Sequence, residues 1–160
     1  GDRGINVTLS YNQDGGHKEI MESIIGDLAK VGVTATSDTP EWSALLEQYQ
    51  NFNYQFGRLG WIADYPIMDN FLYPNSFTGA DNNSEEYSTP ELDAAMLAAR
   101  QIQDEEERKA AYRKICGTIG KDMPVIPIMF YAHNYIGSQR MKSFNYDAQT
   151  KPHFETAELA

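Results

Sequence analysis

The residues best suited to chemistry lie in the segment 58–72, which reads Arg-Leu-Gly-Trp-Ile-Ala-Asp-Tyr-Pro-Ile-Met-Asp-Asn-Phe-Leu and follows a predicted strand. Gly60 permits close approach to the backbone, and Trp61 offers a broad, flat apolar surface. Asp64 stands where the predicted strand gives way to a loop. Because open α/β sheets bind ligands beyond the carboxyl ends of their strands, these residues could form a pocket. The residues alone equally allow Trp61 to pack in the core while Asp64 caps a turn.

Spacings that indicate a metal site or a common catalytic centre are absent from the sequence. His17, His133 and His153 are far apart and form no zinc-binding pattern. The run 81–86 begins like a calcium loop but lacks the glycine that an EF-hand turn needs at its sixth position. A phosphate-binding glycine loop and a Gly-x-Ser-x-Gly elbow are also missing. We therefore expect no catalytic residue, no metal ligand and no cofactor.

Composition restricts the class of protein and its partners. Of 160 residues, 41% are hydrophobic, which is close to the globular average and excludes a disordered chain. The net charge of −10 argues against nucleic acid as a partner, because phosphate binding needs dense Lys and Arg. No apolar run is long enough to cross a bilayer, and the first residues lack the apolar core of a signal peptide. Cys116, the single cysteine, is expected to be a small buried residue on a helical apolar stripe.

Strand and helix patterns alternate in the first third of the chain. Residues 5–11 are apolar at every second position, as in a half-buried strand, and Ile20, Ile24 and Leu28 recur at helical spacing. Gly32 is suited to ending that helix. The expected elements are strand 5–11, helix 17–30, strand 33–36, helix 42–50 and strand 54–61. Strands separated by helices favour parallel pairing, so we predict an α/β fold with a βαβαβ open sheet and flanking helices.

The rest of the chain is predicted to be mostly helical and irregular. Residues 62–88 are expected to form mainly a long loop. Two helices follow, the first capped by Ser88 or Thr89, with Ser88-x-x-Glu91 forming a capping box, and the second starting at Asp104. The apolar run 125–131 is β-like, with Pro127 confining it to a sheet edge or a crossing strand. Expected buried positions are Leu92, Ala95, Met96, Ala99, Ile102, Ala111, Tyr112, Ile115, Cys116 and Ile119. The last residues, 147–160, are expected to have no core of their own.

The motif Gly60-Trp-Ile-Ala-Asp-Tyr-Pro66, with Asn70-Phe-Leu72 downstream, resembles the family-5 extracellular solute-binding proteins, the oligopeptide- and dipeptide-binding components of ABC importers. The resemblance covers nearly the whole chain. The other matching segments, in order, are Lys30-Val-Gly-Val33, Glu41-Trp42, Ser88-Thr-Pro-Glu-Leu-Asp93, Asp104-Glu-Glu-Glu-Arg108 before Tyr112, and Asp122-Met-Pro-Val-Ile-Pro127. The sequence departs from the family at Ile67-Met-Asp69, where acidic residues and proline are common.

The resemblance implies that the chain is a C-terminal piece of a longer protein, mostly the second lobe of a two-lobed, type II periplasmic-binding-protein clamshell that closes over its ligand. Residues 1–130 would form the ligand-binding domain of this lobe, and residues 131–160 would return toward the missing N-terminal lobe. A signal peptide and any lipid-anchor cysteine would lie upstream. The implied location is extracytoplasmic, as a cell-surface lipoprotein or in a periplasm.

The resemblance also implies roles for four residues. In peptide-binding relatives the aspartate of the Trp-x-x-Asp motif holds the α-ammonium of the ligand, and Asp64 matches it. Arg58 matches an arginine that can meet the carboxylate of a short peptide. Trp61 would form a pocket wall, with Tyr65 beside it. The implied function is to capture peptides and deliver them, chemically unchanged, to the membrane permease of an ABC importer.

Two alternatives remain open from the sequence. In an oligosaccharide- or metal-chelate-binding member of the family, Trp61 would stack on the ligand and Asp64 would accept hydroxyl hydrogen bonds. In a carboxylate-based hydrolase, Asp64 and Asp69 would carry the reaction. A carboxylate at position 64 suits a ligand ammonium and so favours a peptide ligand.

Overall fold

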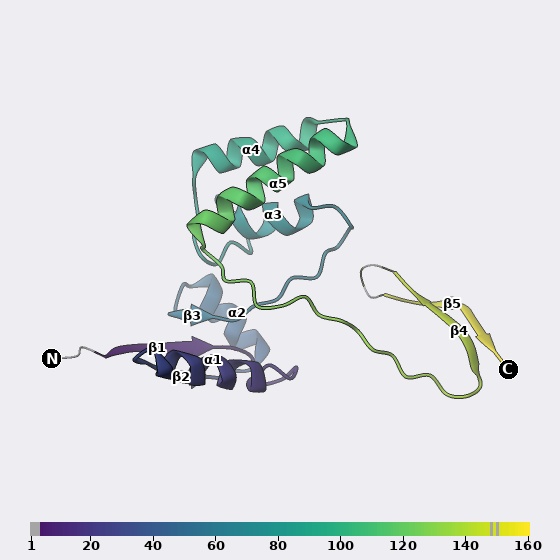
Figure 1. Cartoon of the computed structure of the whole chain (residues 1–160), viewed down its shortest axis with the longest axis horizontal. Helices are drawn as coiled ribbons and strands as arrows, with labels where there is room; N and C mark the ends of the chain where they lie inside the picture. The colour runs from purple at the N-terminus through teal and green to yellow at the C-terminus, as the bar shows by residue number, and fades with distance from the viewer. Residues whose placement is uncertain (1–3, 148, 150) are drawn as a thin grey trace. The chain divides into compact units, whose positions relative to one another are not determined.

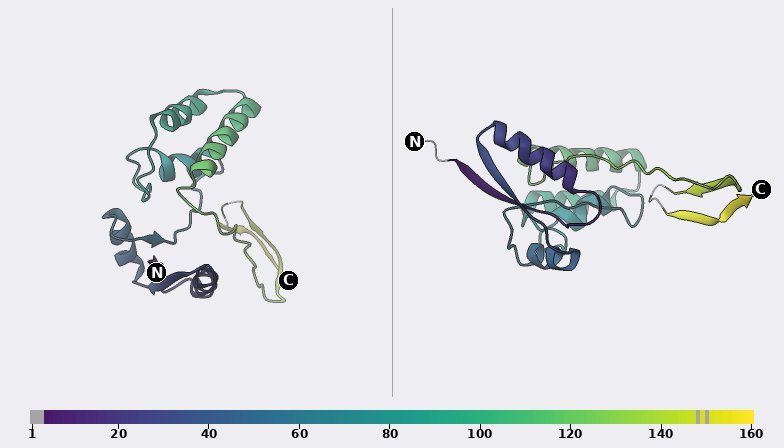
Figure 2. Two further views of the ribbon diagram at one scale, coloured as in Figure 1. Left: turned by 60° about the vertical axis from the view of Figure 1, so that its left-hand side comes forward. Right: turned by 90° about the horizontal axis from the view of Figure 1, so that it is seen from below.

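The computed structural model describes residues 4–147, 149 and 151–160. The chain divides into two compact units, Gly1–Gly60 and Trp61–Ala160. Figure 1 gives the element labels, and Figure 2 shows the same elements from two further directions. Within the described residues, no helix combines the length and apolar character needed to cross a bilayer. The expected domain boundary at residue 130 stays a prediction.

The first unit is a small parallel sheet with two connecting helices. Its elements in chain order are β1 (Ile5–Ser10), α1 (Lys18–Lys30), β2 (Val33–Asp38), α2 (Trp42–Gln50) and β3 (Phe56–Gly57). The strand order is β2-β1-β3, and β1 pairs in parallel with both neighbours. The α/β fold and the βαβαβ order predicted from the sequence are therefore confirmed.

Apolar residues of β1 and α1 make the core of this unit. Leu9, Tyr11 and Met21 are buried, with Val7, Ile24, Ile25, Leu28 and Ala35 packed against them. Helix α1 ends where expected, because Gly32 adopts a positive φ of 84° that residues with a Cβ rarely tolerate. The core thus joins the first strand to the first helix, as the apolar spacing predicted.

The third strand is much shorter than predicted. Residues 54–61 were expected to form it, but only Phe56–Gly57 do, so Trp61 lies outside the sheet. Side chains supply additional hydrogen bonds around this short strand. The Tyr49 hydroxyl lies 2.9 Å from the carbonyl oxygen of Ser10 and 3.0 Å from that of Arg58, and the Gln55 side chain accepts from the Thr8 amide. The Arg58 amide donates to the same Ser10 carbonyl, so these side-chain contacts supplement the backbone pairing at the end of the short strand and do not replace it.

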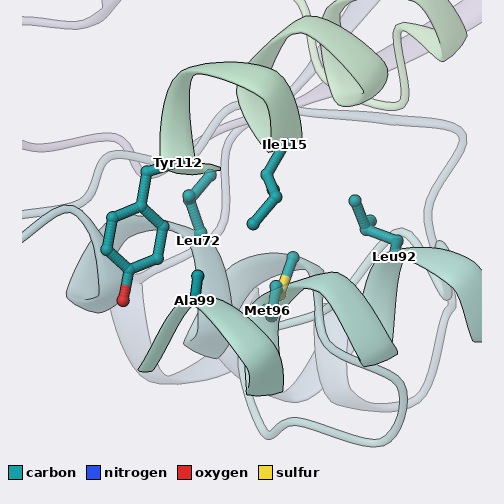
Figure 3. Packing of buried hydrophobic residues seen from close by; sticks show 6 residues of the cluster. All are labelled: Leu72, Leu92, Met96, Ala99, Tyr112 and Ile115. Atoms are coloured by element: carbon teal, nitrogen blue, oxygen red, sulfur yellow. The ribbon is translucent and has the colours of Figure 1, made fainter. Parts of the chain in front are cut away.

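The second unit is built on three helices, α3 (Asp69–Ser76), α4 (Pro90–Gln101) and α5 (Glu105–Asp122). Both views in Figure 2 show α4 and α5 side by side. Figure 3 shows the core between the three helices, which consists of Leu72, Leu92, Met96, Ala99, Tyr112 and Ile115. Five of these six were predicted to be buried, whereas Ala95 is exposed. Cys116 is half-buried against the cluster, and this burial raises the pKa of its thiol.

Most of residues 62–88 is irregular, as predicted, but helix α3 within this range was not expected. Its proline, Pro74, made a helix unexpected, but in an eight-residue helix a proline removes only one intrahelical hydrogen bond. Burial of Leu72 in the helical core and the hydrogen bonds of the buried Asp69 and Asn70 side chains favour the helical conformation. Tertiary packing therefore outweighs local propensity in this segment.

The caps of α4 and α5 match the sequence in part. Thr89 is the N-cap of α4 and its hydroxyl accepts from the Leu92 amide, so the capping box predicted from Ser88 does not form. The Ser88 hydroxyl instead lies 2.8 Å from that of Thr78. Asp104, where the second helix was expected to begin, caps α5 by accepting from the Glu107 amide.

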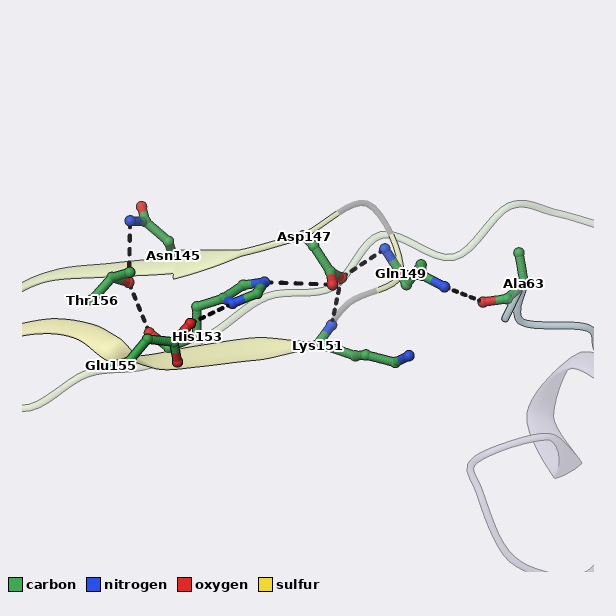
Figure 4. A network of polar contacts seen from close by, with 8 residues as sticks. All are labelled: Ala63, Asn145, Asp147, Gln149, Lys151, His153, Glu155 and Thr156. Carbon is green, nitrogen blue, oxygen red and sulfur yellow. Dashed lines mark hydrogen bonds and ion pairs between the residues drawn. The ribbon is translucent and has the colours of Figure 1, made fainter. Parts of the chain in front are cut away.

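The C-terminal part contains a hairpin that the sequence did not predict. Strands β4 (Met141–Tyr146) and β5 (Pro152–Leu159) pair antiparallel, and Asp147 in the connection accepts from the amides of Gln149 and Lys151 (Figure 4). Phe144 packs against Phe154 across the strands, with ring centroids 5.2 Å apart. The predicted strand at 125–131 is wrong, because that segment is extended without strand pairing.

We predict that Gly57→Ala destabilises the first unit by about 1–3 kcal/mol, because a Cβ there would lie 2.8 Å from the ring and hydroxyl of Tyr49. Urea unfolding followed by the fluorescence of Trp42, in a Trp61→Phe background, measures this. The control is Gly26→Ala within α1, where a Cβ meets nothing within 4 Å and should stabilise by up to about 1 kcal/mol. Equal effects of the two variants would contradict the packing described.

Candidate ligand-binding site

Trp61 and Asp64 are held together by one buried side chain, that of Asn70 at the start of α3. The Asn70 amide oxygen accepts from the Asp64 backbone N–H at 2.7 Å and from the Trp61 indole N–H at 3.3 Å. The Asn70 amide nitrogen donates to Asp64 Oδ2 at 3.4 Å. The structure thus brings two of the four predicted site residues, Trp61 and Asp64, into contact with one side chain, that of Asn70.

The preceding residue, Asp69, fastens the start of α3 to the other helices. Its carboxylate receives two hydrogen bonds of 2.7 Å from the Arg100 guanidinium, and the Tyr65 and Tyr112 hydroxyls lie 3.4 Å away. Arg100 also lies 3.7 Å from the centre of the Tyr73 ring. The hydrogen bonds to Asp69 raise the pKa of Arg100, and burial raises that of Tyr112. A third predicted site residue, Tyr65, therefore lies close to Asp69, the neighbour of Asn70. Asp69 and Asn70 are together called the Asp69–Asn70 anchor.

The side chains that could meet a ligand face solvent. Asp64 and Tyr65 are exposed and Trp61 is half-buried, whereas Asn70 is only 3% exposed. The interactions therefore fall into two layers, with buried groups fixing the backbone and exposed groups available for contact. An accessible carboxylate next to an indole can bind a cationic group and an adjoining apolar surface.

Arg58, the fourth predicted residue, belongs to the first unit. Its backbone amide donates to the Ser10 carbonyl at 2.9 Å, which fixes it just beyond β3. Its guanidinium Nη1 lies 3.0 Å from Nε2 of His17, the residue before α1. Burial, and secondarily the charge of Arg58, lowers the pKa of His17. A neutral imidazole can accept the hydrogen bond from Arg58.

One contact connects the hairpin to the candidate site. The Gln149 side chain donates to the backbone carbonyl of Ala63 at 3.0 Å, between Trp61 and Asp64 in the sequence (Figure 4). The Trp61–Asp64 turn is therefore contacted both from α3 and from the connection between β4 and β5.

The described residues contain no group of three or more His, Cys, Asp or Glu that could hold a metal ion. Asp69, which the hydrolase alternative would need, has both carboxylate oxygens engaged by Arg100. The carboxylate that this alternative would need is therefore already held by a cation within the second unit.

Comparisons with known proteins identify the family of this chain. Residues 1–83 match the sequence model of the bacterial extracellular solute-binding proteins, family 5 Middle. The chain belongs to the family-5 bacterial extracellular solute-binding proteins. The matched residues of this family-5 chain include Arg58, Trp61, Asp64 and Tyr65, as well as the Asp69–Asn70 anchor.

The family-5 chain is similar to the oligopeptide-binding protein OppA of Bacillus subtilis, with 28% identity over 137 residues that cover 85% of this chain and 25% of that protein. It also resembles Haemophilus influenzae OppA, solved in complex with the peptide RPPGFSPFR, with 27% identity and a TM-score of 0.74 over 79% of this chain and 25% of that one. A dipeptide-binding protein of Pseudoalteromonas, at 21% identity and a TM-score of 0.79 over 99% of this chain and 33% of that one, shares the fold. The chain spans about a quarter of the length of the curated relatives it matches.

Sequence reasoning missed the residues that organise the site. Asn70 lies in the family motif, but its spacing from Trp61 carries no periodic signal because a turn separates them. Arg100 lies 31 positions beyond Asp69 and its role depends on the packing of α4 against α3. One signal was present in the sequence, since adjacent Asp and Asn residues directly precede the apolar pair Phe71-Leu72, where burial of polar groups demands partners.

We predict that Arg100→Met destabilises the second unit by roughly 3 kcal/mol, because it leaves the Asp69 carboxylate buried without its cation. Urea unfolding followed by Trp61 fluorescence in a Trp42→Phe background measures the loss. Lys109→Met is the matched control, because Lys109 pairs with Glu105 and Glu106 on the exposed face of α5, where water screens the pairs, so its loss should reduce stability much less. A cost for Arg100→Met as small as that of the control would show that the anchor is not needed.

We also predict that acid weakens the first unit through His17. Its folded pKa lies below its ordinary value of 6.5, so the unfolded chain binds more protons in this range. This contribution to stability is complete above pH 6.5 and is lost as the pH falls below that value. Unfolding free energies between pH 5 and 8, followed by Trp42, should decline more steeply for the native chain than for His17→Gln. Parallel profiles would contradict the assignment.

Proposed function

We propose that this family-5 chain is the ligand-binding part of an extracytoplasmic protein that captures peptides and delivers them to the permease of an ABC importer. The observation that carries the proposal is the exposed Asp64 carboxylate, held next to the Trp61 indole by Asn70. The peptide complex of a relative with 27% identity supports a peptide ligand. Asp64 would accept hydrogen bonds from the α-ammonium of the peptide, and Trp61 would form a wall of the pocket with Tyr65 beside it.

Exclusion of water would decide the strength of this contact. A hydrogen bond to a charged group contributes about 1.5–3 kcal/mol when shielded, whereas an exposed ion pair contributes about 0–1 kcal/mol. Because Asp64 is exposed in this chain, strong binding requires a further surface that covers the ligand. In the proposed clamshell, a second lobe supplies that surface, and Arg58 binds the carboxylate of a short peptide.

The segment 125–131 supports the presence of a further lobe. Its large apolar side chains are exposed, with Phe130 fully so, although their composition is that of a buried strand. The chain also spans only about a quarter of the length of its curated relatives. We propose that this segment and the residues after it pack against the first lobe of the complete protein.

Substitution of Asp64 tests the proposed ligand. In the full-length protein, Asp64→Ala should weaken binding of a peptide with a free N-terminus at least about tenfold, the loss expected for one shielded charged hydrogen bond. A peptide pool incubated with the protein, with the retained material analysed by mass spectrometry, supplies the ligand. Isothermal titration calorimetry then gives its affinity for each variant.

Two controls make the result specific. Asp81→Ala removes the same charge from an exposed loop position and should leave affinity unchanged. Acetylation of the peptide N-terminus should weaken binding to the native protein much more than to Asp64→Ala. An unchanged affinity for Asp64→Ala would exclude the assigned role, and recovery of cleaved peptides would indicate a hydrolase instead.

A further inference from the structure

The Asn70 side chain directs all of its described hydrogen bonds to one short segment of the chain. Its three side-chain hydrogen bonds all reach residues 61–64, the turn that carries the proposed ligand contacts. The donors at Asp64 N–H and Trp61 Nε1–H can only give protons, so the amide oxygen must face them. That orientation directs the amide N–H groups toward the Asp64 carboxylate.

We infer that Asn70 is a positioning residue for ligand binding, which fixes the Asp64 carboxylate and the Trp61 indole in the arrangement that receives a ligand ammonium. The inference rests on the proposed function, since it gives Asn70 its effect through Asp64. Asn70 makes no proposed ligand contact itself and is only 3% exposed.

The neighbouring residue makes Asn70 a rigid support. Asp69 binds Arg100 of α4 and lies within reach of Tyr112 of α5, so the first turn of α3 is tied to both other helices of its unit. The Asn70 backbone amide donates to the Ile67 carbonyl at 3.0 Å, which closes the connection between the turn and the helix. The turn that would contact the ligand is therefore held by a helix that is itself fixed in the core. This limits the conformational entropy that the turn loses when the ligand binds.

Loss of the Asn70 amide would release the turn from this core. In Asn70→Ala, the Asp64 amide and the Trp61 indole lose their described acceptor, and the Asp64 carboxylate loses a donor. Asp64 would then sample several orientations, only one of which suits the ligand. Affinity would fall although every proposed ligand-contacting group is still present.

The first test needs no ligand. In Asn70→Ala, the Asp64 amide should exchange its hydrogen about tenfold faster, as expected for loss of its hydrogen bond, and acrylamide should quench Trp61 more strongly in a Trp42→Phe background. Asn75→Ala in the same helix, whose amide donates only to Phe71 among the bonds described, should change neither signal. Unchanged exchange in Asn70→Ala would overturn the inference.

The second test is a double-mutant cycle of Asn70→Ala and Asp64→Ala in the full-length protein, titrated with the peptide retained from the pool. Asn70→Ala should weaken binding about fivefold, with an effect at least threefold smaller when Asp64 is already Ala. It should also reduce the preference for a free over an acetylated N-terminus. A smaller coupling would overturn the positioning role. Failure of Asp64→Ala alone to weaken binding would instead refute the proposed function, so the two failures are distinguishable.

Discussion

The ion pair between the buried Asp69 carboxylate and the partly exposed Arg100 guanidinium is the constraint on which the second unit depends. A carboxylate taken out of water at the start of a short helix is costly unless a cation and further donors compensate it. Arg100 supplies two short hydrogen bonds, with the Tyr65 and Tyr112 hydroxyls nearby. These directional hydrogen bonds restrict where α3 can lie against α4 and α5, which apolar packing alone does less strictly.

The consequence for the site comes from the residue that follows. Asp69 and Asn70 are adjacent, yet Asp69 binds the helical core and Asn70 binds the Trp61–Asp64 turn. Any shift of the helix start would therefore move the turn with it. This arrangement fixes an exposed loop against a helix, as the proposed recognition of a ligand through Asp64 would require.

Elements with a regular apolar period were predictable from the sequence, and those that depend on distant partners were not. The first two strands, both of their helices and their parallel order followed from spacing, because the first unit has its own core. The third strand was overestimated, since only Phe56 and Gly57 pair with β1, and the Tyr49 and Gln55 side chains supply further hydrogen bonds around it. Helix α3 was missed because Pro74 obscured it and Arg100, far along the chain, stabilises its start. The motif identified Trp61 and Asp64, but only the folded chain shows that Asn70 joins them.

The extended run after α5 has a consequence for the chain in solution. Large apolar side chains are exposed at nearly consecutive positions, namely Val125, Ile126, Ile128, Met129 and Phe130. Pro127 prevents this run from pairing as an ordinary strand along its whole length. Exposed apolar surfaces of this kind associate in water through the hydrophobic effect. Salts that are excluded from protein surfaces strengthen this association. Self-association through this run can therefore begin while both folded units are intact, so the colloidal behaviour of the chain is separate from its conformational stability.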